Sequence, residues 1–431
     1  MNSSINKRVS AIVFGALTAV TLVGRRSMAH WKMLAYVLVG VVLACTILAG
    51  MVVYFDALRE LALKNSLAHR SSTDLDIQIR VSRGPTSAEE YGKVLPVVEQ
   101  RIVNHAQWML QDQIAGGKSP TFSLVNSGNE EAAWEGTDRA FFTFVSKLNN
   151  HVAITDGRAP GDGSSVPRNT PLLLEALVPA EVAREFGVDV GSVFSAVPYG
   201  TSEIPFVSVT ITGLIQDRSA NDEWDFYTDE ILRSRSYMSD LRTMPFYITQ
   251  DAYLNALGPS IGRMSSTYLW FLDTDINRID ADNSRLTLAN LQVMARGGSA
   301  QLQAYTQTSR LNAVLMDFDR RLFFSKLPMF VVLILIALVI LYYVMTMSSL
   351  VVENQRSEVA LFRSRGSDTS HVLTVFVLEG IVIALIAVIV APILAVTTIS
   401  FLGLTPAFNE LTGGSLLSAR LTPGALSLIH I

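Results

Sequence analysis

Cysteine is almost absent from this sequence of 431 residues, since Cys45 is the single example. One cysteine cannot form an intrachain disulfide, and it excludes a zinc site built from several cysteines. The six histidines are scattered along the chain with no two at metal-ligand spacing, and no HExxH motif occurs. The sequence therefore predicts neither a disulfide framework nor a metal site of these kinds.

Charged residues are also scarce. They make up 17% of the chain, whereas an ordinary soluble domain has about a quarter. The formal net charge is −4, so the chain lacks the basic surplus that neutralises nucleic-acid phosphates, and no nucleic acid is expected as a partner. Hydrophobic residues reach 49% and the mean hydropathy is +0.34. These values indicate a membrane protein.

A complete phosphate-binding motif is missing as well. The residues AGGKS at 115–119 resemble the end of a Walker A loop, but Asp112 stands where its first glycine belongs, and we expect a solvated loop. One acidic run could bind a cation but is more simply a surface loop: Asp217, Asp222, Glu223 and Asp225. We predict no catalytic, cofactor or metal site on this chain.

Three long apolar runs are present at 33–55, 327–350 and 372–404. Each is long enough as a helix to cross a hydrocarbon core of about 30 Å. The first is too long for the apolar part of a cleavable signal peptide and lacks a small-residue cleavage site. The third contains Glu379, but its aliphatic residues outweigh the cost of one carboxylate. We predict a multi-pass protein with about three transmembrane helices.

Basic residues next to these runs predict the orientation. Five of them precede the first run, and Arg356, Arg363 and Arg365 lie between the second and third. Because cytoplasmic loops are enriched in lysine and arginine, both regions should face the cytoplasm. Arg320, Arg321 and Lys326 oppose this rule, but they end a long segment, and long segments translocate largely regardless of charge. The N-terminus is then cytoplasmic and the long segment extracytoplasmic, in a plasma membrane.

The segment 9–24 is too short to cross the membrane comfortably and should lie in the inner interface, with a short extra span as the alternative.

The resulting domain plan has seven parts. The parts are a cytoplasmic or interfacial N-terminal segment at 1–30, transmembrane helix 1 at 31–55, an extracytoplasmic domain at 56–321, transmembrane helix 2 at 327–350, a cytoplasmic helix at 351–371, transmembrane helix 3 at 372–404 and an outer loop at 405–431.

The extracytoplasmic domain is expected to have a mixed α+β fold, because segments with period-2 alternation are interspersed with helical patterns. The predicted strands are 74–81, 141–145, 151–155 and 206–215. The predicted helices are 87–114, 179–186, 286–294 and 300–324, the last possibly continuous with transmembrane helix 2.

The segment 353–371 is short, charged and amphipathic, with Gln355, Val359 and Phe362 on one helix face and Gly366 as its end. Such a helix between two spans suits docking into a groove on another protein. Its residues resemble a motif of FtsX/MacB-like ABC transporter permeases. The matching positions are Arg356, Glu358, Val359, Ala360, Leu361, Phe362, Arg363, Gly366, Phe376 and Glu379.

A second set of residues resembles the periplasmic core domain of the same family. It begins with the turn Gly157-Arg158-x-Pro160 and ends with the strand 207–213, and Ser192 replaces the usual aspartate after Gly191. Between them lie Leu174-Glu175-Ala176, Pro179, Val182-Ala183, Phe186-Gly187-Val188 and Val190-Gly191, in the family order.

The resemblance implies a permease subunit without an ATPase of its own, so the chain is not expected to be an enzyme. ATP would bind to a separate ABC ATPase subunit, which contacts the coupling helix at Arg356, Glu358, Val359, Phe362, Arg363 and Gly366. Its activity would drive export, lipoprotein extraction or transmembrane mechanical signalling. Further expected partners are membrane lipid, a second permease half or a second copy, and an extracytoplasmic protein. The family also has a fourth span, so a truncated reading frame is expected.

Glu379 should lie about 12 Å inside the third span, where a carboxylate needs a partner. It would bond to a neighbouring span near the inner interface, or serve a proton or substrate. The alternative function for the chain is a membrane-anchored sensor with an extracytoplasmic ligand-binding domain. That alternative predicts a large cytoplasmic output module, whereas about 20 residues and another span follow here.

Overall fold

The fold is taken from a computed structural model of the chain. The structure describes residues 31–70, 72–127, 138–162, 172–198, 207–218, 242–354, 356, 360, 364, 369–406, 408–409 and 414–420. The chain divides into two compact units: Met1–Asn65 together with Phe318–Ile431 form one, and Ser66–Asp317 form the other. Each unit is described by itself.

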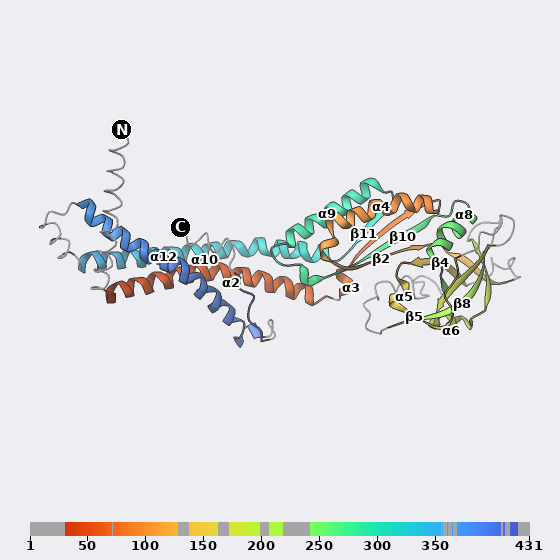
Figure 1. Cartoon of the computed structure of the whole chain (residues 1–431), viewed down its shortest axis with the longest axis horizontal. Coiled ribbons are helices and arrows are strands. Elements are labelled where there is room, and N and C mark those ends of the chain that lie inside the picture. Colours follow the sequence, from red (N-terminus) through yellow and green to blue (C-terminus); the bar gives the residue numbers. More distant parts are fainter. Residues whose placement is uncertain are drawn as a thin grey trace, which may run out of the picture. The chain divides into compact units, whose positions relative to one another are not determined.

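The first unit consists of long apolar helices (Figure 1). They are α2 (Trp31–Ala68), α10 (Leu311–Asn354) and α12 (Thr369–Leu402). In the described part of the chain, these three helices are long and apolar enough to cross a membrane. Because lipid cannot satisfy backbone polar groups, a helix that bonds its own backbone is the form such runs adopt. The predicted fold class, an α-helical membrane protein with a separate α+β domain, is confirmed.

Two of these helices continue beyond their apolar runs. In α2 the polar continuation carries the ion pairs Asp56–Arg59 at 3.3 Å and Glu60–Lys64 at 3.4 Å. Pairs at this spacing lie on one helix face and support helical structure in water. The helix α10 begins at Leu311 and runs into the apolar segment without a break, as the sequence suggested.

The predicted helix 300–324 was wrong in its first part. The preceding helix α9 (Ser284–Gln301) ends there, and β11 (Tyr305–Thr308) follows before α10 begins. β11 pairs antiparallel with β1 (Ile77–Arg83) through residues 78–81. Its hydrogen bonds go to a strand more than two hundred residues earlier, so no local pattern reveals it.

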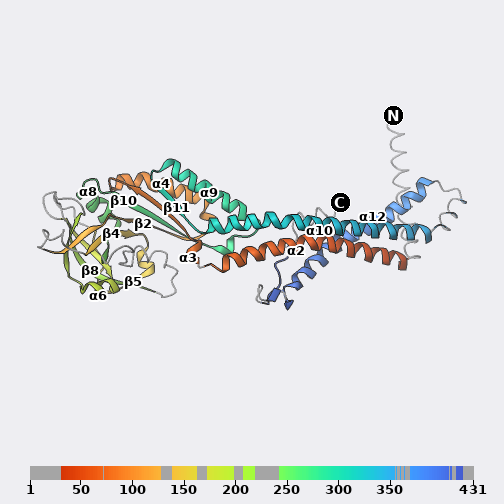
Figure 2. The ribbon, with the colours of Figure 1, turned by 180° about the vertical axis from the view of Figure 1, so that it is seen from behind.

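The second unit is built on an 11-stranded sheet whose first part is open. There, β11, β1, β10 (Ser266–Thr274) and β2 (Leu110–Lys118) are neighbours in that order, all antiparallel. The helices α4 (Ala88–His105) and α9 lie side by side over one face of these strands (Figures 1 and 2).

Aromatic side chains fill the space between α4 and the sheet. The Tyr91 ring centroid lies 4.8 Å from that of Tyr268 and 5.9 Å from that of Phe144. Tyr268 and Trp270 of β10 are both fully buried. Desolvation by this burial raises the pKa of Tyr91 to about 12, which fits a phenol held inside a core.

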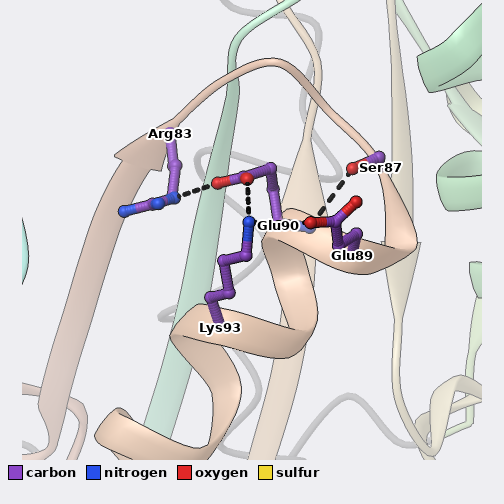
Figure 3. A network of polar contacts seen from close by, with 5 residues as sticks. All are labelled: Arg83, Ser87, Glu89, Glu90 and Lys93. Carbon is purple, nitrogen blue, oxygen red and sulfur yellow. Dashed lines mark hydrogen bonds and ion pairs between the residues drawn. The ribbon is translucent and has the colours of Figure 1, made fainter.

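The N-terminus of α4 follows its sequence signals. Ser87 is the N-cap, and its hydroxyl accepts a hydrogen bond from the backbone N–H of Glu90 at 3.2 Å (Figure 3). The carboxylate of Glu90 accepts from Arg83 at 2.6 Å and from Lys93 at 2.6 Å, so it joins β1 to the first turn of the helix. These two cations, Lys93 first, lower the pKa of Glu90.

The C-terminal part of the predicted helix 87–114 was wrong. The helix ends at His105, a short 3-10 turn follows (η1, Gln107–Met109), and residues 110–118 form β2. Ile114 is buried there and pairs with Phe271 of β10. The β-ladder and the core contact together outweigh the helical periodicity that the segment shows on its own.

The remaining strands close into a ring. Successive pairings run from β4 to β3, β7, β8, β6 and β9, and β9 pairs with β4 again. β5 pairs with β8 outside this ring. The bounds are β3 (Phe122–Asn126), β4 (Arg139–Val145), β5 (Val152–Gly157), β6 (Leu172–Pro179), β7 (Val193–Pro198), β8 (Val207–Asp217) and β9 (Thr243–Tyr247).

Most predicted elements of this region are confirmed. The strands expected at 141–145, 151–155 and 206–215 are β4, β5 and β8, and α6 (Ala180–Phe186) is the short helix after Pro179. The strand expected at 74–81 begins later, at Ile77, because α3 (Ser72–Leu75) precedes it. Other short helices are α5 (Leu148–His151), η4 (Ala252–Leu257, a π-helix), α8 (Gly258–Ser260) and η5 (Ile276–Arg278).

The segment AGGKS at 115–119 is not the solvated loop that we expected. Residues up to Lys118 belong to β2, between β10 and β4. A Cβ atom on Gly116 would lie 2.8 Å from the Phe144 carbonyl oxygen, and one on Gly117 would lie 2.3 Å from the Phe144 ring. These glycines therefore permit close strand and ring packing. Of the acidic run, Asp217 ends β8 and the other three residues lie outside the described residues.

Candidate functional site

The helices α2, α10 and α12 meet at residues with small side chains. A Cβ atom on Gly40 would lie 2.0 Å from the hydroxyl oxygen of Tyr343 on α10. A Cβ atom on Gly50 would lie 3.9 Å from the Cβ of Ala395 on α12. The buried alanines Ala44, Ala49, Ala387, Ala391 and Ala395 extend these contacts along α2 and α12. Small residues let helix backbones approach closely, and helix packing in membranes depends on such contacts.

A cavity of about 490 Å³ lies among these three helices. Aliphatic side chains make up most of its wall, and two aromatic residues, Tyr343 and Phe376, are part of it. The lining residues are Leu34, Val37 and Val41 of α2; Tyr343, Val344, Met347, Ser348, Val351 and Val352 of α10; and Leu373, Phe376, Glu379, Gly380 and Ile383 of α12.

Among the described residues of this lining, Glu379 is the one carboxylate. Its side chain is 7% exposed, and α12 continues on both sides of it as an apolar helix. The next residue, Gly380, leaves open space, because a Cβ atom there would meet no other atom within 4 Å. An acidic group at this depth is costly, and in membrane proteins such groups usually face the bundle interior and have a functional role.

The segment between α10 and α12 is described only in part. Arg356 is helical, and its guanidinium lies 3.9 Å from the carboxylate of Glu353. Its side chain is 77% exposed. Ala360 and Ser364 are helical and exposed too. The other residues predicted to contact an ATPase lie outside the described residues: Glu358, Val359, Phe362, Arg363 and Gly366.

Comparison with known families adds the deciding observation for this region. Residues 330–430 match the family described as FtsX-like permease C-terminal. The match covers most of α10, the segment 353–371 and all of α12. The chain carries an FtsX-like permease domain. Over these residues the chain is similar to the membrane subunits of that family.

One solved structure similar to this chain is the periplasmic region of MacB from Actinobacillus actinomycetemcomitans. The two chains share 8% identity with a TM-score of 0.26, and the aligned part covers 57% of this chain and 92% of the other. No curated protein matches the chain.

Outside the FtsX-like domain, the second unit brings together the residues of the second sequence motif. Arg158 and Glu175 form a two-point ion pair, and one of its hydrogen bonds measures 2.8 Å. The Glu175 carboxylate also accepts a hydrogen bond from the backbone N–H of Gly161 at 2.8 Å. Arg158 first, and then Gly161, lower the pKa of Glu175. The turn that begins at Gly157 is therefore fixed to β6.

Glycine is favoured at two positions of this motif, for reasons that differ between them. Gly157 has φ +78°, and a Cβ atom there would lie 2.2 Å from the carbonyl oxygen of Thr212 on β8. Gly187 has φ +67° and ends α6, but a Cβ atom there would meet nothing within 4 Å. Left-handed conformations favour glycine in both cases, and Gly157 also permits close contact between β5 and β8. The motif therefore has a structural role here.

Within the described ranges, no three His, Cys, Asp or Glu side chains come close enough together to hold a metal ion. Among the described residues, the cavity between α2, α10 and α12 is therefore the best candidate for a binding site. It combines an apolar wall, two aromatic rings and one carboxylate. Sequence reasoning found Glu379 from its position in an apolar run, but it missed Tyr343, Ser348 and Gly380, which become neighbours only when the helices pack.

Proposed function

We propose that this FtsX-like permease converts the work of a separate ATP-hydrolysing subunit into movement of α10 and α12. The family match supports the proposal, because it covers these two helices and the short segment that connects them. That segment, at 353–371, is the coupling helix of the proposal. ATP binds to the partner subunit and not to this chain.

Apolar side chains of the coupling helix make the main contact in this proposal. In a helical register the sequence places Val359 and Phe362 on one face, and apolar groups on a small helix gain free energy when a partner covers them. In this proposal Arg356, Glu358 and Arg363 add polar contacts, and the sequence predicts that the helix ends at Gly366. The 77% exposure of Arg356 is consistent with this role.

The proposed orientation follows from the basic residues beside the apolar helices. The unit Ser66–Asp317 lies outside the plasma membrane and the coupling helix lies in the cytoplasm. Membrane lipid and a second permease half, or a second copy of this chain, complete the transmembrane part. The movement serves export, lipoprotein extraction or transmembrane mechanical signalling to an extracytoplasmic partner.

The test of the coupling helix is co-purification with an ATP-binding cassette subunit that is co-expressed with this chain. The double variant Val359→Asp with Phe362→Asp should lose at least nine-tenths of the bound ATPase, about a tenfold loss in affinity. The matched control places the same two charges on the opposite helix face, as Ala360→Asp with Ser364→Asp. These two residues are helical and exposed, and the control should retain the ATPase. Equal binding by both double variants would overturn the proposal.

The orientation has a separate test, which uses the single cysteine. In a Cys45→Ser background, Glu181→Cys reports on the second unit and Glu353→Cys on the end of α10. In intact spheroplasts, a membrane-impermeant maleimide should label the first variant only. The second should react after permeabilisation. The reverse pattern would invert the proposed topology.

A further inference from the structure

The helix α9 has an apolar stripe on the side that faces away from the sheet. Its core-facing residues recur at intervals of three and four positions and are buried: Ser284, Thr287, Leu291, Met294 and Gly298. On the other side, Leu286 is 61% exposed and Val293 is 46% exposed. Ala289 and Ala300 are exposed as well. Because an α-helix has 3.6 residues per turn, these four residues lie on one face.

The spacing of this stripe is that of a seam at which two helices pack. Leu286, Val293 and Ala300 are seven residues apart, and Ala289 stands three residues after Leu286. Positions a and d of a heptad repeat in this way, and they pack against a second helix. Single exposed apolar residues are ordinary, whereas an aligned set on one face indicates an interaction surface. The alanines allow a second helix to approach closely.

An arginine lies on each side of the stripe. On one side Arg296 is exposed, and its guanidinium donates a hydrogen bond to the neutral amide oxygen of Gln292 at 3.3 Å. Gly297 borders the stripe on the other side. A Cβ atom there would lie 1.8 Å from the guanidinium of Arg101 on α4, the helix next to α9 (Figures 1 and 2). The helix α9 itself contains no aspartate or glutamate.

We propose that this stripe docks an acidic amphipathic helix of an extracytoplasmic protein. The apolar side chains of that helix cover Leu286 and Val293, and the burial of apolar surface supplies most of the binding free energy. Its carboxylates, at the e and g positions that flank the seam, pair with Arg101 and Arg296. Complementary charges of this kind determine the choice of partner and its register.

Two other occupants fit the stripe less well. A second copy of this chain would bring α9 against α9 across a two-fold axis, and the arginines would then face each other. A membrane surface favours helices whose apolar face has bulky residues such as tryptophan and phenylalanine, whereas two of the four residues in this stripe are alanines. An acidic helix avoids both conflicts.

The experiment measures the binding of a labelled synthetic peptide to the full chain in phosphatidylcholine nanodiscs by fluorescence anisotropy, with empty nanodiscs as the background. The peptide has about three heptads, with leucine at a, alanine at d and glutamate at e and g. A second peptide has lysine in place of the glutamates. We expect the unmodified chain to bind the glutamate peptide about tenfold more tightly than the lysine peptide.

Two variants test the two parts of the surface. Leu286→Ser with Val293→Ser removes both apolar contacts and should weaken binding of the glutamate peptide about tenfold. Arg296→Glu should weaken binding of the glutamate peptide and strengthen binding of the lysine peptide. The matched control is Val103→Ser on α4. Val103 is 57% exposed, but it stands two residues from Arg101 and so points away from the stripe. This control should bind like the unmodified chain.

Five results would overturn the proposal. Three of them are equal binding of the two peptides, unchanged binding by the double variant, and an equal loss of binding in the Val103→Ser control. Displacement of the glutamate peptide by phosphatidylglycerol vesicles would assign the stripe to a membrane surface. Self-association of the chain that the double variant abolishes would assign it to a second copy. All substituted residues are exposed, so the variants should fold.

This inference deepens the proposed function, because it gives the extracytoplasmic partner a contact surface. It rests on that function for the side of the membrane on which the partner lies. The binding assay contains no ATPase and does not depend on the orientation in a cell, so either proposal can fail without the other.

Discussion

Gly40 of α2 and Tyr343 of α10 are so close that a Cβ atom on the glycine would lie 2.0 Å from the tyrosine hydroxyl oxygen. Close approach of this kind increases the van der Waals contact between the helices. In lipid this contact stabilises helix association, because the hydrophobic effect that acts in water is absent there. The ring of Tyr343 thus occupies the space that any larger residue at position 40 would need.

Gly40→Val should destabilise the helical unit by about 1–3 kcal/mol, the usual cost of adding methyl groups to a packed site. The measurement is thermal unfolding of the detergent-solubilised chain. Gly50→Ala is the matched control in the same helix, because its Cβ makes ordinary contact with Ala395 at 3.9 Å, and it should change stability by less than about 0.5 kcal/mol. An equal effect of both variants would show that the Tyr343 contact is unimportant.

Gly157→Ala should destabilise the second unit more than Gly187→Ala. Both residues have positive φ, which costs a side chain about 1–2 kcal/mol, but a Cβ atom clashes only at Gly157, 2.2 Å from the Thr212 carbonyl oxygen. Thermal unfolding followed by tryptophan fluorescence measures the difference. Equal losses would mean that backbone conformation alone explains both glycines.

The Arg158–Glu175 pair should make part of the stability of the second unit depend on pH. The pKa of the Glu175 carboxyl group is lowered in the folded protein from its ordinary value of 4.5. The stabilisation by the ion pair is therefore complete above about pH 4.5, and it is lost as the pH falls through the lower pKa of the folded state. Because the side chains of Arg158 and Glu175 are 64% and 34% exposed, solvent screens the ion pair, and we expect its contribution to the stability to be small.

The matched variant for this pair is Glu175→Gln. It should be less stable than the unmodified chain at pH 7, and the difference in melting temperature should shrink as the pH is lowered toward about 3. A difference that stays constant over this range would rule out the ion pair as its source.

Loss of the Ser87 cap should destabilise α4. Ser87→Ala removes the hydroxyl that accepts the Glu90 N–H (Figure 3), at a cost of about 1 kcal/mol. Ser87→Asp keeps an acceptor oxygen and should retain most of the stability. Hydrogen exchange of the amides in the first turn of α4 measures the effect locally, and equal exchange in both variants would contradict the capping role.

Local sequence patterns predicted the elements whose structure depends on local forces. The apolar runs gave the three long helices, since an unbroken apolar helix in lipid has no competing structure. The patterns at 141–145, 151–155 and 206–215 gave β4, β5 and β8, and the start of the helical pattern at residue 87 gave the start of α4. In each case the local pattern agrees with the structure that the sheet or the lipid requires.

The errors occurred where distant partners decide the structure. Residues 110–114 are a strand because β10 pairs with them, and β11 interrupts the predicted helix because β1 pairs with it. Gly116 and Gly117 were expected in a solvated loop, but they lie in β2, and Phe144 of β4 explains both glycines. The cavity could not be predicted for the same reason. Its lining comes from three helices, and Gly380 and Tyr343 carry no local signal of their meeting.

The ring formed by β4, β3, β7, β8, β6 and β9 also affects how this part of the molecule comes apart. A closed ring has no outermost strand from which fraying can start, and the removal of any one member creates two new edges at once. These strands should therefore open together, with amide protons of similar protection along the whole circuit. A destabilising substitution in any one connecting turn should then lower the amide protection of every strand in the ring.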